Sequence, residues 1–463
     1  MAIKEFQEDT IVAVSTPPGE GGIGVVRLSG KEAVAVVDVI FRSKAGRRVR
    51  DQKSFTVQYG HAVCGSSVID EVLVLLMRAP KSYTCEDIVE ISAHGGRAVM
   101  AAIVEAALKA GARLAAPGEF TKRAFLNGRI DLVQAEAVLD LIQAKTELGR
   151  RWATARLEGS LSEEIAKIKN ELIGILSHLE ASIDFPDDGL ETEPHAAVES
   201  RLKILLSNFE RLLESANAGI LAKTGLAVVL CGRPNVGKSS LMNRLVGSSR
   251  VIVTPYPGTT RDVVEEEIQI QGFPVRIQDT AGFRDADHPI EKEGIERSRK
   301  ALASADLVLW ILDGSQAWTP EDAEFLKDFA DKKKILVVNK SDLPKKLDKA
   351  ALAARFHGTP VVESSCVASA GTEVLEKEIH RSIIGEKLTI SEEAVVGSAR
   401  QKHLLEQASE DLKRAAHACR EGLSGEFVAA DVRLALDRLG ALVGDTTTDD
   451  VLEVLFGQFC IGK

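Results

Sequence analysis

The chain has 463 residues, of which 45% are hydrophobic and 27% charged, a composition typical of a folded protein of about three domains. Its net charge of −10 argues against a surface coated with basic, nucleic-acid-binding residues, although a local basic groove is compatible with it. Six cysteines form no Cys-x-x-Cys pair, the first ten residues lack a signal-peptide core, and no apolar run reaches the ~18 residues of a membrane helix. We expect a reduced cytoplasmic protein without a structural metal or a membrane segment.

Residues 11–30 predict a strand, a glycine-rich turn and a second strand. Gly19, Gly21 and Gly24 match the G-x-G-x-x-G pattern of dinucleotide sites. Such a loop must open a helix, whereas Val25–Leu28 is short and rich in valine, so we reject a dinucleotide site. We predict a hairpin whose glycines would let a ligand approach the backbone.

Residues 31–123 alternate between helical and strand-like pieces, which predicts an α+β domain. The helical pieces are 33–41 and 98–110, and the strand-like pieces are 55–63, 68–77 and 88–92. A basic cluster follows the first helix and comprises Arg42, Lys44, Arg47, Arg48 and Arg50. We interpret it as a solvated loop, with contact to a phosphate backbone as the alternative.

Long helices are predicted after residue 121. Apolar residues spaced by threes and fours run through Leu161–Ile183, the stretch Asp184–Gly189 breaks that helix, and a second stripe covers Leu202–Leu213. Helical pattern returns at about 392 and continues to Leu442. The simplest topology is a nucleotide domain inserted into a helical domain, and a linear string of three domains is the alternative.

Gly232-Arg-Pro-Asn-Val-Gly-Lys-Ser239 has the G-x-x-x-x-G-K-[ST] spacing of a phosphate-binding loop. An apolar, strand-like run, Leu226–Cys231, precedes it, and helical apolar spacing follows it. The glycines would turn backbone N–H groups toward phosphates at the positive end of the helix. Lys238 would reach the β- and γ-phosphates, and the Ser239 hydroxyl would bind Mg²⁺.

Four further stretches follow in order and specify the nucleotide. In Gly258-Thr-Thr-Arg-Asp262 a threonine would close over Mg²⁺, and Asp279-Thr-Ala-Gly282 would place Asp279 at a strand end near that ion. In Asn339-Lys-Ser-Asp342 a carboxylate would accept both N1–H and N2–H₂ of guanine, a donor pair that adenine lacks. Ser364-Ser-Cys-Val367 would bring a backbone N–H to guanine O6. Together they predict a guanine nucleotide site.

The residue after Gly282 is Phe283, where many GTPases of this fold have a glutamine that orients water. A phenyl ring cannot orient water, so hydrolysis would need another residue and another positive charge. The acids and arginines of 284–297 are the candidates. The alternative is a protein that hydrolyses poorly.

These residues resemble the bacterial and organellar tRNA-modification GTPases of the MnmE or TrmE family. The resemblance spans nearly the whole chain and includes motifs far outside the GTPase stretches: Thr16-Pro-Pro-Gly, Gly22-Ile-Gly-Val-Val-Arg27, Pro117 to Asn127, Asp184-Phe-Pro186 and the terminal Phe459-Cys-Ile-Gly-Lys463. It implies a multidomain α/β plus α protein. An α+β tetrahydrofolate-binding and dimerisation domain would occupy 1–123, an all-α domain 124–219 and 387–463, and an inserted Ras-like P-loop GTPase domain 220–386.

The resemblance also implies the roles of residues in the GTPase domain. Potassium would be held by Asn235 and by the positions of Thr254, Tyr256 and Thr259, Mg²⁺ by Ser239 and Thr260, and water would be oriented by Glu291, with Lys238 as a further catalytic residue. The nucleotide contacts would be Asn235, Val236, Gly237, Lys238, Ser239, Ser240, Thr254, Thr259, Thr260, Asp279, Thr280, Ala281, Gly282, Asn339, Lys340, Asp342, Ser365 and Cys366.

The family's folate contacts would fall on Arg27, Glu90, Arg129 and Lys463, and Cys460 would be catalytic in tRNA modification. Cys85 stands where glycine is common in the family. The implied protein is a K⁺-dependent GTPase and homodimer. With a flavoprotein partner that carries FAD, it would add an aminomethyl or carboxymethylaminomethyl group to C5 of the wobble uridine of certain tRNAs. The carbon would come from a 5-formyl- or 5,10-methylene-type tetrahydrofolate.

Two alternatives differ in class. The first is a regulatory GTPase of ribosome assembly without small-molecule chemistry, which would leave the terminal Cys-Ile-Gly-Lys unexplained. The second is a scaffold or dimerisation protein that binds nucleotide, which a deficient segment after Gly282 would favour.

Overall fold

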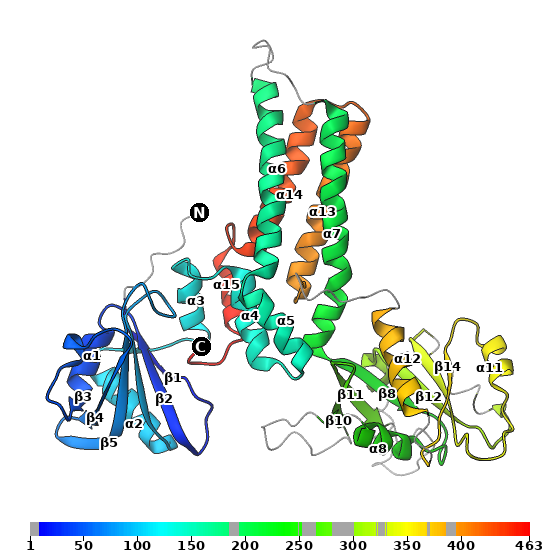
Figure 1. Ribbon diagram of the computed structural model, residues 1–463, viewed down its shortest axis with the longest axis horizontal. Helices are drawn as coiled ribbons and strands as arrows, with labels where there is room; N and C mark the ends of the chain where they lie inside the picture. The colour runs from blue at the N-terminus through cyan, green and yellow to red at the C-terminus, as the bar shows by residue number, and fades with distance from the viewer. Residues whose placement is uncertain are drawn as a thin grey trace. The chain divides into compact units, whose positions relative to one another are not determined.

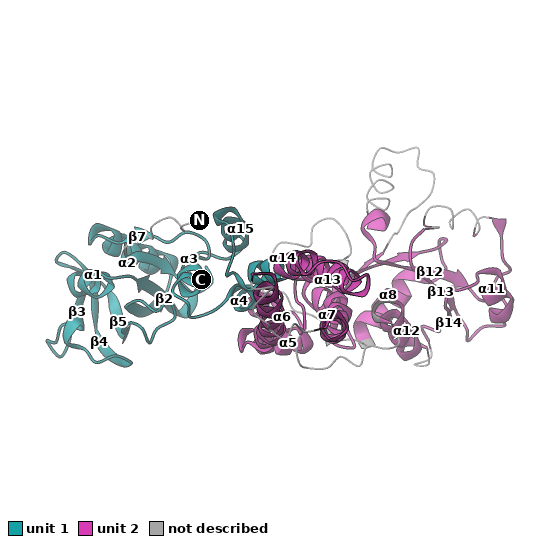
Figure 2. Cartoon of the chain, turned by 90° about the horizontal axis from the view of Figure 1, so that it is seen from above, with its two compact units in different colours: residues 1–139, 436–463 teal, residues 140–435 magenta. Residues whose placement is uncertain are grey.

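The computed structural model describes residues 9–184, 194–248, 250–251, 265–279, 301–320, 322, 329, 331–367, 371–385 and 395–463. The chain divides into two compact units, unit 1 (residues 1–139 and 436–463) and unit 2 (residues 140–435), as Figure 2 shows. The chain passes between the units inside helices α4 (Leu132–Gln143) and α14 (Gly425–Val443). The result is a multidomain α/β plus α protein, while the limits of the three domains set out above stay a prediction.

Unit 1 is built on a seven-stranded sheet of order β3-β4-β5-β6-β2-β1-β7 (Figure 1). Its strands are β1 (Ile11–Val14), β2 (Gly21–Ser29), β3 (Phe41–Ser43), β4 (Thr56–Cys64), β5 (Ser67–Met77), β6 (Ile88–Gly95) and β7 (Arg113–Leu114). Its helices are α1 (Ala33–Ile40), the 3₁₀ turn η1 (Val49–Asp51), α2 (Arg97–Lys109), α3 (Glu119–Leu126), α15 (Asp449–Phe456) and parts of α4 and α14.

The predicted hairpin is confirmed, because β1 pairs antiparallel with β2. The strand begins at Gly21, so most of the glycines belong to the ladder with β6 and not to the turn. A Cβ added to Gly24 would lie 3.1 Å from Gly95 Cα, and one added to Gly95 would lie 2.7 Å from Gly21 O. These glycines therefore allow two backbones to approach closely.

One face of this sheet is covered by α1 and α2, which bury Val26, Leu28, Val72, Val74 and Ile91 in the main core of the unit. A smaller cluster lies on the other side, where Phe120 of α3 packs with Ile11, Ala13, Ala115 and Tyr83. Gly118, before α3, has a φ of 66°, and a Cβ there would lie 2.6 Å from Phe456 O. Glycine thus lets α15 pack directly against the start of α3.

Arg123 of α3 is 1% exposed and is surrounded by three carboxylates. It contacts Asp9 Oδ1 at 2.6 Å, Glu119 Oε1 at 3.0 Å and Glu86 Oε2 at 3.1 Å. Burial opposes ionisation of Glu119, but hydrogen bonds from Arg113 and from the Ala116 N–H hold the pKa of that carboxyl below its ordinary value. This buried cluster links α3 to the segment between β5 and β6.

Unit 2 contains a second seven-stranded sheet, of order β14-β13-β12-β8-β11-β10-β9. The strands are β8 (Leu226–Cys231), β9 (Arg250–Val251), β10 (Glu265–Ile270), β11 (Phe273–Asp279), β12 (Leu307–Asp313), β13 (Lys334–Asn339) and β14 (Val361–Glu363). The five strands from β14 to β11 are parallel to one another, and β10 pairs antiparallel with both of its neighbours, β11 and β9. Helices α8 (Lys238–Ser248), α11 (Lys349–Arg355) and α12 (Thr372–Ile384) accompany them. Apolar clusters on both faces of the sheet explain why the central strands are almost wholly apolar.

The helical part of unit 2 comprises α5 (Glu147–Leu157), α6 (Ser160–Asp184), α7 (His195–Thr224), α13 (Ala399–Arg420) and the first part of α14. The stripe predicted for α6 is buried at Leu161, Ile165, Ile168, Leu172, Ile175 and Leu179. The helical pattern predicted for 392–442 is two helices, because α13 ends at Arg420 before Gly422, whose φ of 66° is a typical helix-ending conformation. No described helix is long and apolar enough to cross a membrane.

Candidate functional site

The phosphate-loop motif lies between β8 and α8, as its pattern predicts. Gly232 has a φ of 154°, and a Cβ there would lie 2.4 Å from Ile311 O. Gly237 has a φ of 97°, and a Cβ there would lie 2.3 Å from Asn339 Nδ2. Both positions therefore require glycine, and the loop leads directly to the N-terminus of α8, the end of a helix that attracts phosphate.

Lys238 is buried and its ammonium lies inside the loop. Its Nζ donates hydrogen bonds to Gly232 O at 3.0 Å and to Arg233 O at 3.1 Å. Burial lowers the pKa of Lys238, partly offset by the nearby carboxylate of Asp279. A phosphate would supply the negative charge that favours the ammonium form.

Ser239 Oγ donates a hydrogen bond to Asp279 Oδ2 at 2.8 Å, which joins the phosphate loop to the end of β11. Asp279 Oδ1 is buried and has no hydrogen-bond partner within the described part of the chain. A hydroxyl and a carboxylate beside a phosphate loop are oxygen donors of the kind that Mg²⁺ prefers. These two residues fit a Mg²⁺ ion.

The predicted guanine-binding residues lie against the same loop. Asn339 Nδ2 donates to Val236 O at 2.9 Å, and Cys366 Sγ lies 3.6 Å from Asn339 Oδ1. Ser365 Oγ donates to Asp342 Oδ1 at 2.5 Å, which orients the carboxylate predicted to select guanine. Residues 339–342 and 364–367 thus form one surface with the phosphate loop, although their bonded residues are 23 and 27 positions apart in sequence.

Asp313 belongs to this arrangement and was missed by the sequence reasoning. It ends β12, is 2% exposed, and its Oδ2 lies 2.7 Å from Lys340 Nζ, which also donates to Asn235 O at 2.8 Å. Burial opposes ionisation, but Lys340 and Ser315 hold the pKa of Asp313 below its ordinary value. An aspartate at the carboxyl end of an apolar parallel strand was the available signal.

Several predicted residues lie outside the described part of the chain: Thr254, Tyr256, Thr259, Thr260, Thr280, Ala281, Gly282 and Glu291, and also Phe283. Ser240 is described and exposed on α8 beside Ser239. Asn235 is exposed in the loop and has a φ of 63°, a conformation that asparagine tolerates better than most residues.

A second cluster of predicted residues lies on unit 1. Arg27 of β2 and Glu90 of β6 are cross-strand partners and form an ion pair of 2.8 Å. The Arg129 guanidinium lies 4.9 Å from the centre of the Tyr83 ring, and the Arg27 guanidinium lies 5.7 Å from it. Burial, followed by the nearby charge of Arg27, lowers the pKa of Lys463. The structure therefore brings all four predicted folate contacts into one region.

A glycine lets the last residues of the chain pass close to the end of β1. Gly462 has a φ of 98°, and a Cβ there would lie 2.2 Å from Val14 O, at the end of β1. Cys460 is exposed two residues earlier, and its carbonyl accepts a hydrogen bond from the Lys463 N–H at 3.3 Å. The described residues hold no group of three or more metal-ligating His, Cys, Asp or Glu side chains.

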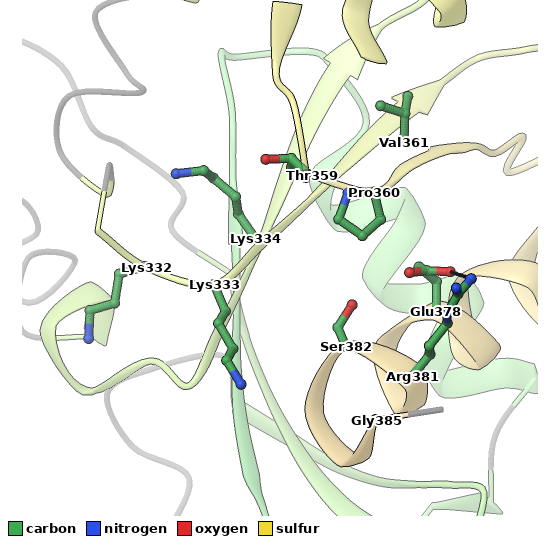
Figure 3. A pocket seen from close by; sticks show the side chains of 11 residues that line it. Lys332, Lys333, Lys334, Thr359, Pro360, Val361, Glu378, Arg381, Ser382 and Gly385 are labelled. Atoms are coloured by element: carbon green, nitrogen blue, oxygen red, sulfur yellow. Dashed lines mark ion pairs between the residues drawn. The ribbon is translucent and has the colours of Figure 1, made fainter. Parts of the chain in front are cut away.

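A hollow of about 730 Å³ lies at the amino-terminal ends of β13 and β14 in the unit 2 sheet (Figure 3). Lys332 donates to Ala303 O at 2.6 Å, Lys334 donates to Phe329 O at 3.4 Å, and Arg381 pairs with Glu378. These cations thus serve the protein's own backbone and a carboxylate. The nucleotide loops follow the other ends of the strands, so this hollow is separate from them.

Comparison with known proteins identifies the family. Residues 10–129 match the model described as "GTP-binding protein TrmE N-terminus", and residues 132–460 match the "MnmE helical domain". The chain belongs to the MnmE/TrmE family.

Curated relatives in this family match over almost the whole chain. A protein of Thermoanaerobacter pseudethanolicus named "tRNA modification GTPase MnmE" is 43% identical, with 98% of this chain and 99% of the relative covered. Its namesake in Symbiobacterium thermophilum is 46% identical, with 98% and 100% covered. The G domain of the FeoB iron transporter of T. maritima is 28% identical over 34% of this chain and 98% of that domain, with a TM-score of 0.27, too low to describe the whole fold.

Cys85 stands at a position where glycine is common in the MnmE/TrmE family. Cys85 has a φ of 60°, a left-handed conformation that glycine adopts at little cost. It lies in the segment that carries Tyr83, whose contact with two of the predicted folate residues the sequence reasoning also missed. A tyrosine in a loop carries no periodic signal that would have revealed it.

Proposed function

We propose that this protein is a K⁺-dependent GTPase that modifies tRNA. With a flavoprotein partner that carries FAD, it adds an aminomethyl or carboxymethylaminomethyl group to C5 of the wobble uridine, position 34. The observation that carries the proposal is the joint surface of Lys238, Ser239, Asp279 and Asp342 in a chain whose relatives are named tRNA modification GTPases.

GTP would be held by the phosphate loop and by the guanine-binding stretches. Lys238 and the N-terminus of α8 would take the phosphates, and Ser239 and Thr260 would bind Mg²⁺, with Asp279 beside them. Asp342, oriented by Ser365, would accept the two guanine N–H groups. The Mg²⁺ ion supplies positive charge to the phosphates when it is bound.

Potassium and Glu291 would complete the GTPase machinery. Because Phe283 replaces the water-orienting glutamine, the positive charge would come from K⁺ held by Asn235 and by backbone at Thr254, Tyr256 and Thr259. Lys340 donates to the Asn235 carbonyl at 2.8 Å, which fixes the backbone of the residue that would hold the ion. Glu291 would orient water, but this residue and the other K⁺ positions lie outside the described part of the chain.

A tetrahydrofolate derivative would bind on unit 1. Glu90 suits the amide-like donors of a pterin, while Arg27, Arg129 and Lys463 offer positive charge to its carbonyl and to the glutamate carboxylates. The lowered pKa of Lys463 follows from burial, and an anionic ligand would favour its charged form. Cys460 would act in tRNA modification. The chain would form a homodimer, and this homodimer would bind the flavoprotein partner.

The decisive experiment is mass spectrometry of wobble nucleosides in tRNA from cells that lack this chain. We expect loss of the C5-modified uridine and its return when the wild-type gene is restored. Restoration with Cys460→Ser should leave the uridine unmodified. Unchanged nucleosides in the deletion strain, together with a defect in ribosomal subunits, would instead favour the regulatory GTPase of ribosome assembly.

A further inference from the structure

Tyr83 occupies the centre of the cluster on unit 1 that we assign to folate. It lies in the segment between β5 and β6, and its ring packs with Ile11, Ala13, Ala115 and Phe120. Its hydroxyl shares a hydrogen bond of 2.9 Å with Thr121 Oγ1, and Thr121 is fully buried in α3. Both the body and the tip of the side chain are therefore held in place.

The segment that carries Tyr83 is itself anchored from three directions. Asn127 Nδ2 donates to Thr84 O at 2.6 Å, and Thr84 Oγ1 lies 2.6 Å from Ser29 Oγ. Ser29 Oγ also donates to Glu86 Oε2 at 2.7 Å, and the buried Arg123 holds the same carboxylate. A residue in this segment has little freedom to move.

The Tyr83 ring lies within cation–π range of two guanidinium groups. Arg129 is 4.9 Å from its centre and Arg27 is 5.7 Å from it, both inside the ~6 Å over which a ring attracts a cation. The two arginines carry like charges, so an aromatic ring that attracts both offsets part of their repulsion. The ring thus fixes where two predicted ligand-binding cations lie.

The two arginines depend on Tyr83 to different degrees. Arg27 also pairs with Glu90 at 2.8 Å and lies 5.7 Å from the centre of the Phe120 ring. For the Arg129 guanidinium, the polar and ring contacts found within the described residues are both with Tyr83, through the ring and through Tyr83 O at 3.0 Å. Loss of the ring would therefore affect Arg129 more than Arg27, because it would leave the Arg129 guanidinium only the bond to the Tyr83 backbone carbonyl.

We propose that Tyr83 is a positioning residue of the folate site, whose ring face holds the guanidinium groups of Arg129 and Arg27 in place for an anionic reduced folate. The inference rests on the proposed folate binding by Arg27, Glu90, Arg129 and Lys463. Tyr83 acts through the two arginines and not as a ligand contact of its own.

The test is a double-mutant cycle on the full-length chain, with binding of (6S)-5-formyltetrahydrofolate measured by isothermal titration calorimetry. We expect Tyr83→Leu and Arg129→Met each to weaken binding about tenfold. The double variant should bind about as weakly as Arg129→Met alone, because without the Arg129 guanidinium the ring no longer has that cation to position. Tyr83→Phe should stay within about twofold of wild type, since it keeps the ring face and loses only the bond to Thr121.

A second measurement separates the ring's electrostatics from its shape. Replacing Tyr83 by phenylalanine and then by 3,4,5-trifluorophenylalanine leaves the ring in place but removes much of the negative charge on its face. We expect affinity to fall about threefold or more from the first to the second, with the thermal unfolding midpoint unchanged. This comparison holds even where Tyr83→Leu fails to fold.

The outcomes are distinguishable. Wild type that does not bind the folate overturns the proposed folate function together with the inference. If wild type binds the folate, three results overturn the positioning role alone. Tyr83→Leu binds as tightly as wild type, the losses of the two single variants multiply to about a hundredfold in the double variant, or the proteins with the two ring analogues bind the folate equally well.

Discussion

Asp313 Oδ2 and Lys340 Nζ form an ion pair of 2.7 Å that connects the end of β12 to the first residue after β13. The same ammonium donates to Asn235 O, so one lysine links a buried carboxylate, the phosphate loop and the guanine-binding stretch. Asp313 is not itself a predicted nucleotide contact, so replacing its carboxylate tests this link through the loss of the charged partner of Lys340.

For Asp313→Asn we expect GTP affinity to fall about tenfold, because Lys340 would lose the charged partner that holds it against the phosphate loop. Loss of one member of a partly buried pair costs roughly 1–3 kcal/mol of interaction free energy. Titration with a fluorescent GTP analogue measures the effect. Lys345→Gln is the matched control, since its ion pair with Glu363 is exposed and such pairs contribute about 0–1 kcal/mol. Equal affinity for Asp313→Asn and wild type would contradict the linking role.

Asp342→Asn should shift nucleotide preference from GTP toward XTP, because an amide offers a donor where guanine also presents one. Hydrolysis rates with the two nucleotides at several concentrations check this. Ser365→Ala removes the hydrogen bond to Asp342 and should weaken GTP binding without changing the preference. Unchanged selectivity of Asp342→Asn would remove the assignment of guanine to this stretch.

GTP turnover should be stimulated by K⁺ over Na⁺ at equal ionic strength by about tenfold or more. Asn235→Gly should abolish the difference between the salts, since glycine accepts the φ of 63° and lacks the side-chain oxygen. Equal wild-type rates in the two salts would argue against a potassium site.

Gly462→Ala should weaken folate binding by about tenfold, because a Cβ 2.2 Å from Val14 O must displace the segment that carries Lys463. Gly65→Ala is the matched control, as Gly65 also has a positive φ, of 60°, but a Cβ there meets nothing within 4 Å. Similar loss in both variants would point to general backbone strain and not to the terminal segment.

Glu119 should make the stability of the protein depend on acid. Because its pKa is lower in the folded than in the unfolded chain, its contribution is present above its ordinary pKa of 4.5 and is lost as the pH falls through the folded value. Thermal unfolding midpoints of wild type and Glu119→Gln, measured from pH 7 downward, should converge under acid. A constant gap between the two curves would contradict this account.

The sequence predicted the regular elements well because their signals are local. The stripe of α6 and the apolar strands β8 and β13 follow directly from residue spacing. Relations between distant strands carry no such signal: the start of β2 at Gly21 depends on the approach of β6, and the Asp313–Lys340 pair depends on the parallel register of β12 and β13. The break after Arg420 was missed because isolated glycines, here Gly422 and Gly425, only weakly interrupt a helical pattern.

For the candidate site, motif spacing predicted the phosphate loop, and the structure adds how its residues are held. Tyr83 and Asp313 escaped prediction because their roles come from neighbours that lie far away in sequence. Arg123 with Asp9 and Glu86 is a similar case, since a buried cation is recognisable only when its carboxylates are placed around it.

A Cβ on Gly462 would lie 2.2 Å from Val14 O, so the first and last segments of unit 1 lie together although residues 140–435 separate them in sequence. During synthesis, residues 140–435 leave the ribosome before the segment 436–463 that completes unit 1. Unit 2 is therefore able to fold before unit 1 is complete, and the proposed folate site, which includes Lys463, is completed last. The nucleotide site can thus form before the proposed folate site, although the first residues of the proposed folate site are made earlier.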